Sequence, residues 1–180
     1  SLLPKFGTPE PDAINIAMLH TSLAGSQGHD PYAPCSVPEL IAMGFDYWAL
    51  GHVHKRQVHS EAPWIVMPGI PQGRDIGEAG PKSATLLTID EKNIVVSEVP
   101  TSAAEFIEVW VSADGIESDD DLRHQIRDVL LRTAKELASD AGLIRLSIGG
   151  ETSRKWQILR DQDSWREVVA ELARSTGVLW

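Results

Sequence analysis

A short apolar run that stops at a glycine and two histidines is the feature that most constrains how this chain folds. The run covers 46–50 and continues into Gly51-His52-Val53-His54. Alternate side chains of an extended strand point to the same side, so His52 and His54 are expected to point the same way beyond a strand end. A glycine lets the backbone bend at that point and leaves space beside it. The pattern predicts a buried strand whose end presents two imidazoles.

A second apolar run, 14–19, ends in another histidine, His20. Neutral imidazole is the commonest metal ligand among protein side chains. Two strand ends that carry histidines predict one metal site at one edge of a sheet, with His20, His52 and His54 as candidate ligands. A histidine at a strand end is also often a structural residue held by a hydrogen bond, and this alternative stays open for all three.

The remaining sequence predicts a mixed α/β (α+β) fold in two parts, 1–100 and 101–180. Strands are predicted from short apolar runs. Helices are predicted from a capping residue followed by apolar residues at helical spacing. In the first part we predict a helix over 36–44 capped by Ser36, a strand over 64–67, a loop rich in glycine and proline over 68–82, and a hairpin of 84–89 with 94–99.

The second part predicts strand, long helix, strand, helix. The strands are expected at 106–111 and 143–148. Ser118 and Asp121 form a capping-box pattern for the long helix, which is expected to end at Gly142. Asp163 is expected to cap the last helix. Two strands and two one-faced helices are enough for a small satellite domain.

Composition excludes several classes of protein. The formal net charge is −10, which argues against a protein that coats nucleic acid with a basic surface. No run approaches the roughly 18 apolar residues of a membrane span, so no membrane partner is expected. The single cysteine, Cys35, excludes an internal disulfide framework and fits a reducing cytoplasm.

The histidine motifs and the loop after them carry a family resemblance. Leu19-His20 followed by Gly51-His52-Val53-His54 resembles the C-terminal half of calcineurin-like metallophosphoesterases, and the match is closer to their DNA-repair exonuclease branch, the bacterial SbcD-type nucleases. In that branch the motif is followed by a loop like 68–74 and then by Glu78, Gly80 and Lys82. The resemblance covers 14–99, and 105–180 is similar, more weakly, to the family's capping domain.

The resemblance implies a two-metal phosphodiesterase built on two sheets. Two divalent ions, typically Mn²⁺ in this branch, would activate a water and neutralise the phosphate. By match to the motifs, His20 and His52 would ligate one ion and His54 the other. It also implies a cytoplasmic hydrolase that acts on DNA ends in DNA repair. Such an enzyme would form a homodimer and bind an SbcC-like coiled-coil ATPase.

The family's other ligand motifs are absent from this sequence. They are Asp-x-His, Gly-Asp-x-x-Asp and Gly-Asn-His, and no Gly-Asp pair occurs anywhere in the chain. Three neutral imidazoles without a carboxylate hold a dinuclear centre poorly, because nothing anionic bridges the two ions. We therefore expect the chain to be the C-terminal part of a nuclease subunit and to be inactive when isolated, with no catalytic residue of its own. Strands left without their partners are expected to self-associate through an open edge.

The loop 68–82 supports two interpretations. In one, Gln72 or Arg74 touches a substrate phosphate. In the other, Arg74 pairs with Glu78 or Asp75 and closes the loop. Asp46 is expected to brace the strand that leads to His52, and His59 and His124 are expected to be solvated.

Two alternative functions remain open from the sequence. One is a metallophosphoesterase that acts on small nucleotides or phosphoproteins and does not need the 105–180 module. The other is a non-enzymatic docking module for a partner ATPase.

Overall fold

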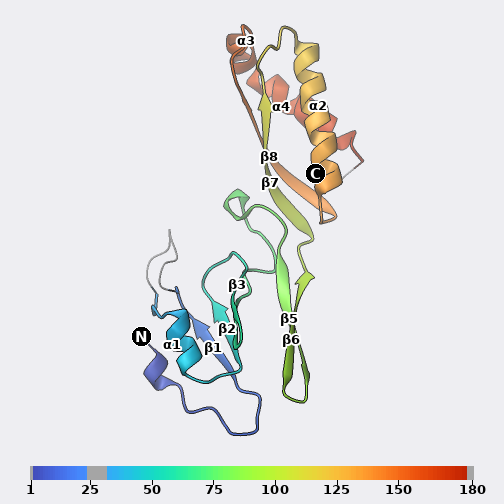
Figure 1. Cartoon of the computed structure of the whole chain (residues 1–180). Helices are drawn as coiled ribbons and strands as arrows, with labels where there is room; N and C mark the ends of the chain where they lie inside the picture. The colour runs from blue at the N-terminus through green and yellow to red at the C-terminus, as the bar shows by residue number, and fades with distance from the viewer. Residues whose placement is uncertain (1, 24–31, 178–180) are drawn as a thin grey trace. The chain divides into compact units, whose positions relative to one another are not determined.

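The structure, a computed structural model, describes residues 2–23 and 32–177. It confirms the mixed α/β class (Figure 1). The chain forms two compact units: the first contains the residues up to Pro71 together with Lys82–Thr101, and the second contains Gln72–Pro81 together with the chain from Ser102 onward.

Within residues 2–23 and 32–101, apart from the loop that belongs to the second unit, the first unit carries eight elements. They are η1 (Leu3–Lys5), β1 (Ile16–His20), α1 (Val37–Ala42), β2 (Tyr47–Gly51), β3 (Gln57–Glu61), β4 (Trp64–Met67), β5 (Ser83–Asp90) and β6 (Asn93–Pro100). The helix α1 begins where the sequence predicts, because the Ser36 side chain accepts a hydrogen bond from the Glu39 backbone and Glu39 completes a capping box.

Three strands of this unit run parallel in one sheet. The order is β1-β2-β4-β3, with β1, β2 and β4 parallel and β3 antiparallel to β4. The carboxyl ends of parallel strands meet at one edge of a sheet, which is where open α/β sheets bind ligands. In this sheet, His20 at the end of β1 and the Gly-His-Val-His segment at the end of β2 both lie at that edge.

The apolar core of the first unit lies on one face of this sheet. Trp48 is fully buried, and its indole N–H donates to the Leu40 carbonyl of α1 at 3.1 Å. Its ring also packs edge-on against Phe6 and Phe45. The core comprises Leu3, Ala17, Leu19, Leu23, Cys35, Leu40, Trp48, Leu50, Ile65 and Met67. This packing fixes β2, and with it the start of the histidine segment.

The hairpin β5–β6 is attached to the sheet by polar side chains. The Trp64 indole N–H donates to the Ile94 carbonyl at 3.1 Å. Arg56 donates to the Thr85 hydroxyl and pairs with Glu98 at 3.3 Å. The hairpin is paired in full register, as the sequence predicts.

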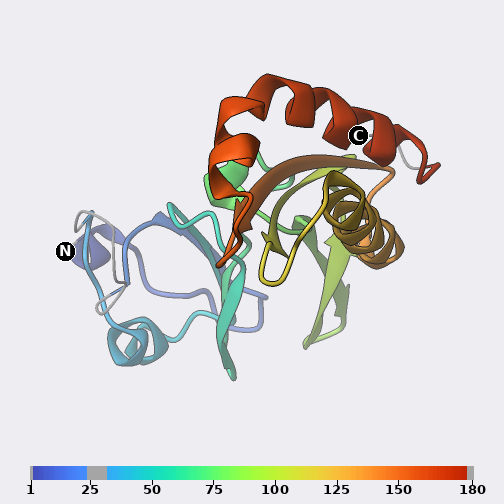
Figure 2. The ribbon, with the colours of Figure 1, turned by 90° about the horizontal axis from the view of Figure 1, so that it is seen from above.

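The second unit packs two helices on a pair of parallel strands. Its elements are η2 (Ile76–Glu78), β7 (Ala104–Ser112), α2 (Asp119–Glu136), β8 (Ala141–Gly149), α3 (Lys155–Arg160) and α4 (Gln162–Arg174). β7 and β8 are parallel, and α2 and α4 lie beside them (Figure 2). Val111, Leu122, Ile126, Leu130 and Trp165 are among the buried residues of the shared core.

Two details of the second unit differ from the sequence predictions. Asp163 does not cap the last helix: it lies in the first turn of α4, and the N-cap is Asp161, whose side chain makes no capping hydrogen bond. The long helix ends at Glu136 rather than at Gly142. Beyond it the Ala138 N–H donates to the buried Glu105 carboxylate at 2.9 Å, which turns the chain toward the start of β8. Among the helices of the described residues, none is long and apolar enough to cross a bilayer.

Candidate metal site

Strand register brings two of the three predicted histidines together. His20 is the last residue of β1 and pairs with Gly51, the last residue of β2. The next N–H, that of Thr21, donates to the Gly51 carbonyl at 3.0 Å, so the ladder extends past the strand end. Because His52 follows Gly51 directly, the register places His20 and His52 side by side at the carboxyl edge.

The two imidazoles face each other through nitrogen atoms. His20 Nε2 lies 3.2 Å from His52 Nδ1, and the two rings are nearly perpendicular, with centroids 5.0 Å apart. At this distance one neutral ring donates and the other accepts, and the tautomers decide which. The described residues therefore contain a coupled pair of imidazoles at the predicted edge.

The backbone conformation at Gly51 and His52 is restricted. His52 has a φ of 111°, in a region that side chains rarely adopt. A Cβ on Gly51 would lie 3.2 Å from His20 Nδ1, so the glycine provides the room that the His20 ring uses. Strain of this kind persists only where the surrounding structure imposes it, and it clusters at functional sites.

His54, the third predicted ligand, is half-buried beyond the pair. Its backbone is approached closely by the loop after β4. A Cβ on Gly69 would lie 2.9 Å from the His54 carbonyl oxygen, and Gly69 has a φ of 77°. Gly69 belongs to the glycine-rich loop that the sequence predicts over 68–82, and the close approach that it allows here is to the backbone of His54.

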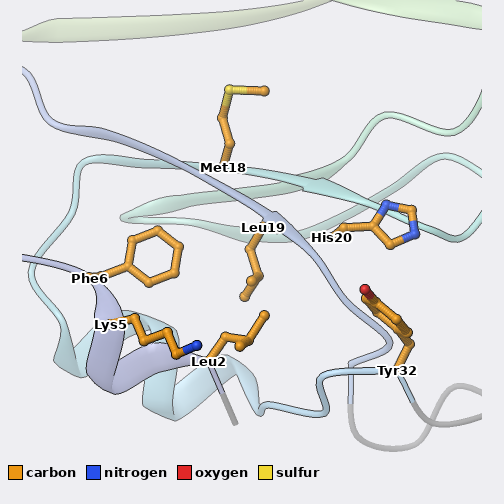
Figure 3. A pocket seen from close by; sticks show the side chains of 7 residues that line it. All are labelled: Leu2, Lys5, Phe6, Met18, Leu19, His20 and Tyr32. Atoms are coloured by element: carbon orange, nitrogen blue, oxygen red, sulfur yellow. The ribbon is translucent and has the colours of Figure 1, made fainter.

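An aromatic residue that the sequence did not mark lies against both imidazoles. The Tyr32 ring is stacked on His52, with centroids 5.7 Å apart and planes 19° apart, and it meets His20 edge-on at 5.3 Å. Tyr32 also borders a cavity of about 380 Å³ with Lys5, His20 and the apolar side chains of Leu2, Phe6, Met18 and Leu19 (Figure 3). Nothing in the local sequence around Tyr32 signals this position.

The imidazole pair fits as part of a divalent-metal site. Two nitrogens bound to one ion at about 2.1 Å are about 3.0–3.4 Å apart in octahedral or tetrahedral geometry, and the observed separation is 3.2 Å. Imidazole nitrogens suit zinc, iron, copper and nickel, whereas manganese prefers sites that also contain oxygen ligands. Within residues 2–23 and 32–177, however, no three His, Cys, Asp or Glu side chains gather closely enough to hold an ion. The pair supplies two ligands and no carboxylate.

The two predicted substrate-binding residues are engaged in the second unit. The Gln72 amide N–H donates to the Ala104 carbonyl at 2.8 Å, and its oxygen accepts from the Ala103 N–H at 2.9 Å. Arg74 pairs with Glu78 at 3.0 Å, and its backbone N–H donates to the same carboxylate at 2.8 Å. The loop-closing pair is therefore present, while substrate binding by Gln72 and Arg74 stays a prediction.

Two other polar residues have structural partners. The Asp46 carboxylate accepts from the Asn15 N–H at 2.7 Å, next to the start of β1 and β2, which agrees with its expected bracing role. His59 in β3 is half-buried rather than solvated, and the loss of hydration lowers its pKa.

Comparison with known proteins points to one family. Residues 106–180 match the family model described as the middle domain of metallophosphoesterase YhaO. A relative in Bacillus subtilis strain 168, described as the uncharacterized metallophosphoesterase YhaO, is 49% identical over 82 residues, which is 45% of this chain and 20% of the relative. The chain thus spans about a fifth of the curated relative it matches. These similarities support a relation to the metallophosphoesterase family.

Proposed function

We propose that this chain contributes to a metal-dependent phosphodiesterase, with His20 and His52 as ligands of one divalent ion and His54 as a ligand of its neighbour. The observation that carries the proposal is the 3.2 Å separation of His20 Nε2 and His52 Nδ1 at the carboxyl edge of two parallel strands. The similarity of residues 106–180 to a metallophosphoesterase middle domain supports the same class of hydrolase independently.

The histidines and Gly51 contribute to the proposed site through where they lie. His20 Nε2 and His52 Nδ1 face each other at 3.2 Å, and Gly51 leaves the space in which the His20 ring stands. Divalent ions held in such a site activate a water and neutralise the charge that develops on a phosphodiester. Because the described residues add no carboxylate to the pair, we propose that the three histidines are one part of a larger ligand set, and that this chain is inactive without the rest.

We propose DNA ends as the substrate and Mn²⁺ as the metal, in the manner of the SbcD-type branch. The net charge of −10 supports a role for bound cations, since the chain has no excess of basic residues to meet a polyanion. The same proposal includes a homodimer, a coiled-coil ATPase partner of the SbcC type, and a cytoplasmic location.

The test uses the complete open reading frame that encodes this chain. Mn²⁺-dependent hydrolysis is measured on linear DNA, on covalently closed DNA and on bis(p-nitrophenyl) phosphate. His52→Ala is expected to lower activity by more than about 100-fold, because even changes outside the ligand set of metal sites cost about 10- to 100-fold. The control is His124→Ala, an exposed residue of α2, which is expected to retain activity.

Together, the variant and the three substrates test the metal role of His52, the phosphodiesterase activity, the exonuclease activity and the preference for DNA ends separately. Unchanged hydrolysis in His52→Ala would overturn the metal role of this residue. Hydrolysis of the small diester without attack on linear DNA would keep the phosphodiesterase and reject the exonuclease. Equal attack on linear and closed DNA would reject the preference for ends.

A further inference from the structure

The Tyr32 ring contacts both imidazoles of the candidate site. Its ring lies face to face with His52, at an interplanar angle of 19°, and edge-on to His20, at 83°. A stacked contact limits the tilt of one imidazole, while an edge contact limits the rotation of the other. One ring thus restrains two side chains that must point their nitrogens at a common place.

The backbone of Tyr32 is itself anchored next to His20. The Tyr32 N–H donates to the Ser22 hydroxyl at 3.0 Å, and the Ser22 N–H donates to the Tyr32 carbonyl at 2.8 Å. Ser22 is buried and lies two residues beyond His20. The position of the Tyr32 ring is therefore tied to the same strand end that carries His20.

Burial does not explain why an aromatic residue occupies this position. The Tyr32 side chain is 54% exposed, and it does not belong to the buried core of the first unit. Figure 3 shows the Tyr32 side chain beside His20 among the residues that line the cavity. Its contacts with the two imidazoles are the specific interactions that the ring makes, and they lie at the candidate metal site.

We propose that Tyr32 is a positioning residue that holds His20 and His52 in the orientation in which Nε2 and Nδ1 face each other. This inference rests on the proposed function for its consequence, since oriented imidazoles matter for metal binding. The orientation of the imidazoles is expected to depend on the aromatic ring of Tyr32 and not on its hydroxyl.

The first test observes the imidazoles directly in metal-free protein. Long-range ¹H–¹⁵N NMR spectra report the tautomer of each histidine. In the wild type, the bond between His52 and His20 is expected to select one tautomer for each ring. Tyr32→Phe keeps the ring and is expected to give the same spectrum, whereas Tyr32→Leu is expected to give tautomer-averaged signals for these two histidines alone.

The outcomes of this test are decisive. Wild-type signals in Tyr32→Leu would overturn the proposal, and so would equal changes in Tyr32→Phe and Tyr32→Leu. His59 and His124 serve as internal references, and a change in their signals as well would show a general structural role and overturn it too. Trp156→Leu, which removes an aromatic side chain that is 78% exposed, is the matched control and is expected to leave the His20 and His52 signals unchanged.

The second test separates this inference from the proposed function. Mn²⁺ affinity is measured by calorimetry on the complete gene product, and Tyr32→Leu is expected to bind about tenfold more weakly while Tyr32→Phe matches the wild type. If the wild type binds no Mn²⁺ through His20 and His52, the proposed function fails, while the metal-free spectra still decide the role of Tyr32. If affinity is unchanged in Tyr32→Leu, the positioning role in metal binding is rejected.

Discussion

His52 occupies a backbone conformation that few residues other than glycine adopt. Its φ of 111° is the kind of strain that costs about 1–3 kcal/mol and is kept where the surrounding structure and a function require it. The imidazole that results lies 3.2 Å from His20 and against Tyr32. A glycine would relieve the strain at the expense of the imidazole.

A comparison of two small residues at position 52 measures this strain. His52→Gly is expected to be more stable than His52→Ala by about 1 kcal/mol, because alanine keeps the strain and glycine does not. Urea unfolding measures the difference. At the neighbouring Val53, which is not in the positive-φ region, the order is expected to reverse. A more stable His52→Ala would show that position 52 is unstrained.

The pH dependence of stability is expected to include a term from His59. Burial lowers the pKa of this imidazole, so the unfolded state binds a proton more readily than the folded state. Its contribution is therefore complete above about pH 6.5, the ordinary value for histidine, and is lost as pH falls through the lower folded pKa. The free energy of unfolding should fall less on acidification in His59→Gln than in the wild type. Parallel pH profiles would contradict this.

At the scale of single elements, the sequence was sufficient to predict the elements that depend on interactions between residues close together in the chain. The capping boxes at Ser36 and Ser118 and the strand at Trp64–Met67 were predictable, because side chains three residues apart and continuous apolar runs determine them. β3 was not predicted, since Gln57–Glu61 is polar, exposed at its edge and defined by pairing with β4.

Two of the features that the sequence did not predict involve contacts between distant segments. α2 ends at Glu136, and two residues later the Ala138 N–H donates to the Glu105 carboxylate on β7, a contact that no local pattern reveals. The same holds at the candidate site: the strand ends identified His20 and His52, but the contact of Tyr32 with them depends on its hydrogen bonds to Ser22. The sequence predicted the two histidines that lie together, but it gave no sign of the aromatic ring that contacts them.

The α2 cap offers a test of element stability. Ser118→Ala removes the hydroxyl that accepts the Asp121 N–H at 3.1 Å and is expected to destabilise the second unit by about 1 kcal/mol. Ser147→Ala, at an exposed strand position, is expected to change stability little. Chemical denaturation followed by circular dichroism compares the two variants. Equal effects would show that the cap does not limit α2.

At the scale of the whole molecule, the sheet of the first unit has an exposed edge at β1. The strand order places β1 at the end of the sheet, and in the described residues no strand pairs with its outer side. Met18 and Ile16 on this strand are 78% and 45% exposed. Edge strands with exposed apolar side chains pair readily with other chains.

We therefore expect this chain to self-associate through β1 as its concentration rises. Met18→Lys is expected to shift the species toward monomer, because a charge on an edge strand opposes pairing. Light scattering over a concentration series measures the effect, with the exposed Leu159→Lys of α3 as the control. A monomeric wild type at the highest concentration would contradict this expectation.

The most direct measurement is anomalous diffraction from crystals of the complete gene product grown with Mn²⁺. We expect an anomalous peak about 2.0–2.2 Å from both His20 Nε2 and His52 Nδ1, a distance typical of nitrogen ligands, and loss of that peak in His52→Ala. A second peak is expected at His54. Peaks that appear only elsewhere, or a peak at His20 that survives in His52→Ala, would contradict the assignment of this histidine pair as a metal site.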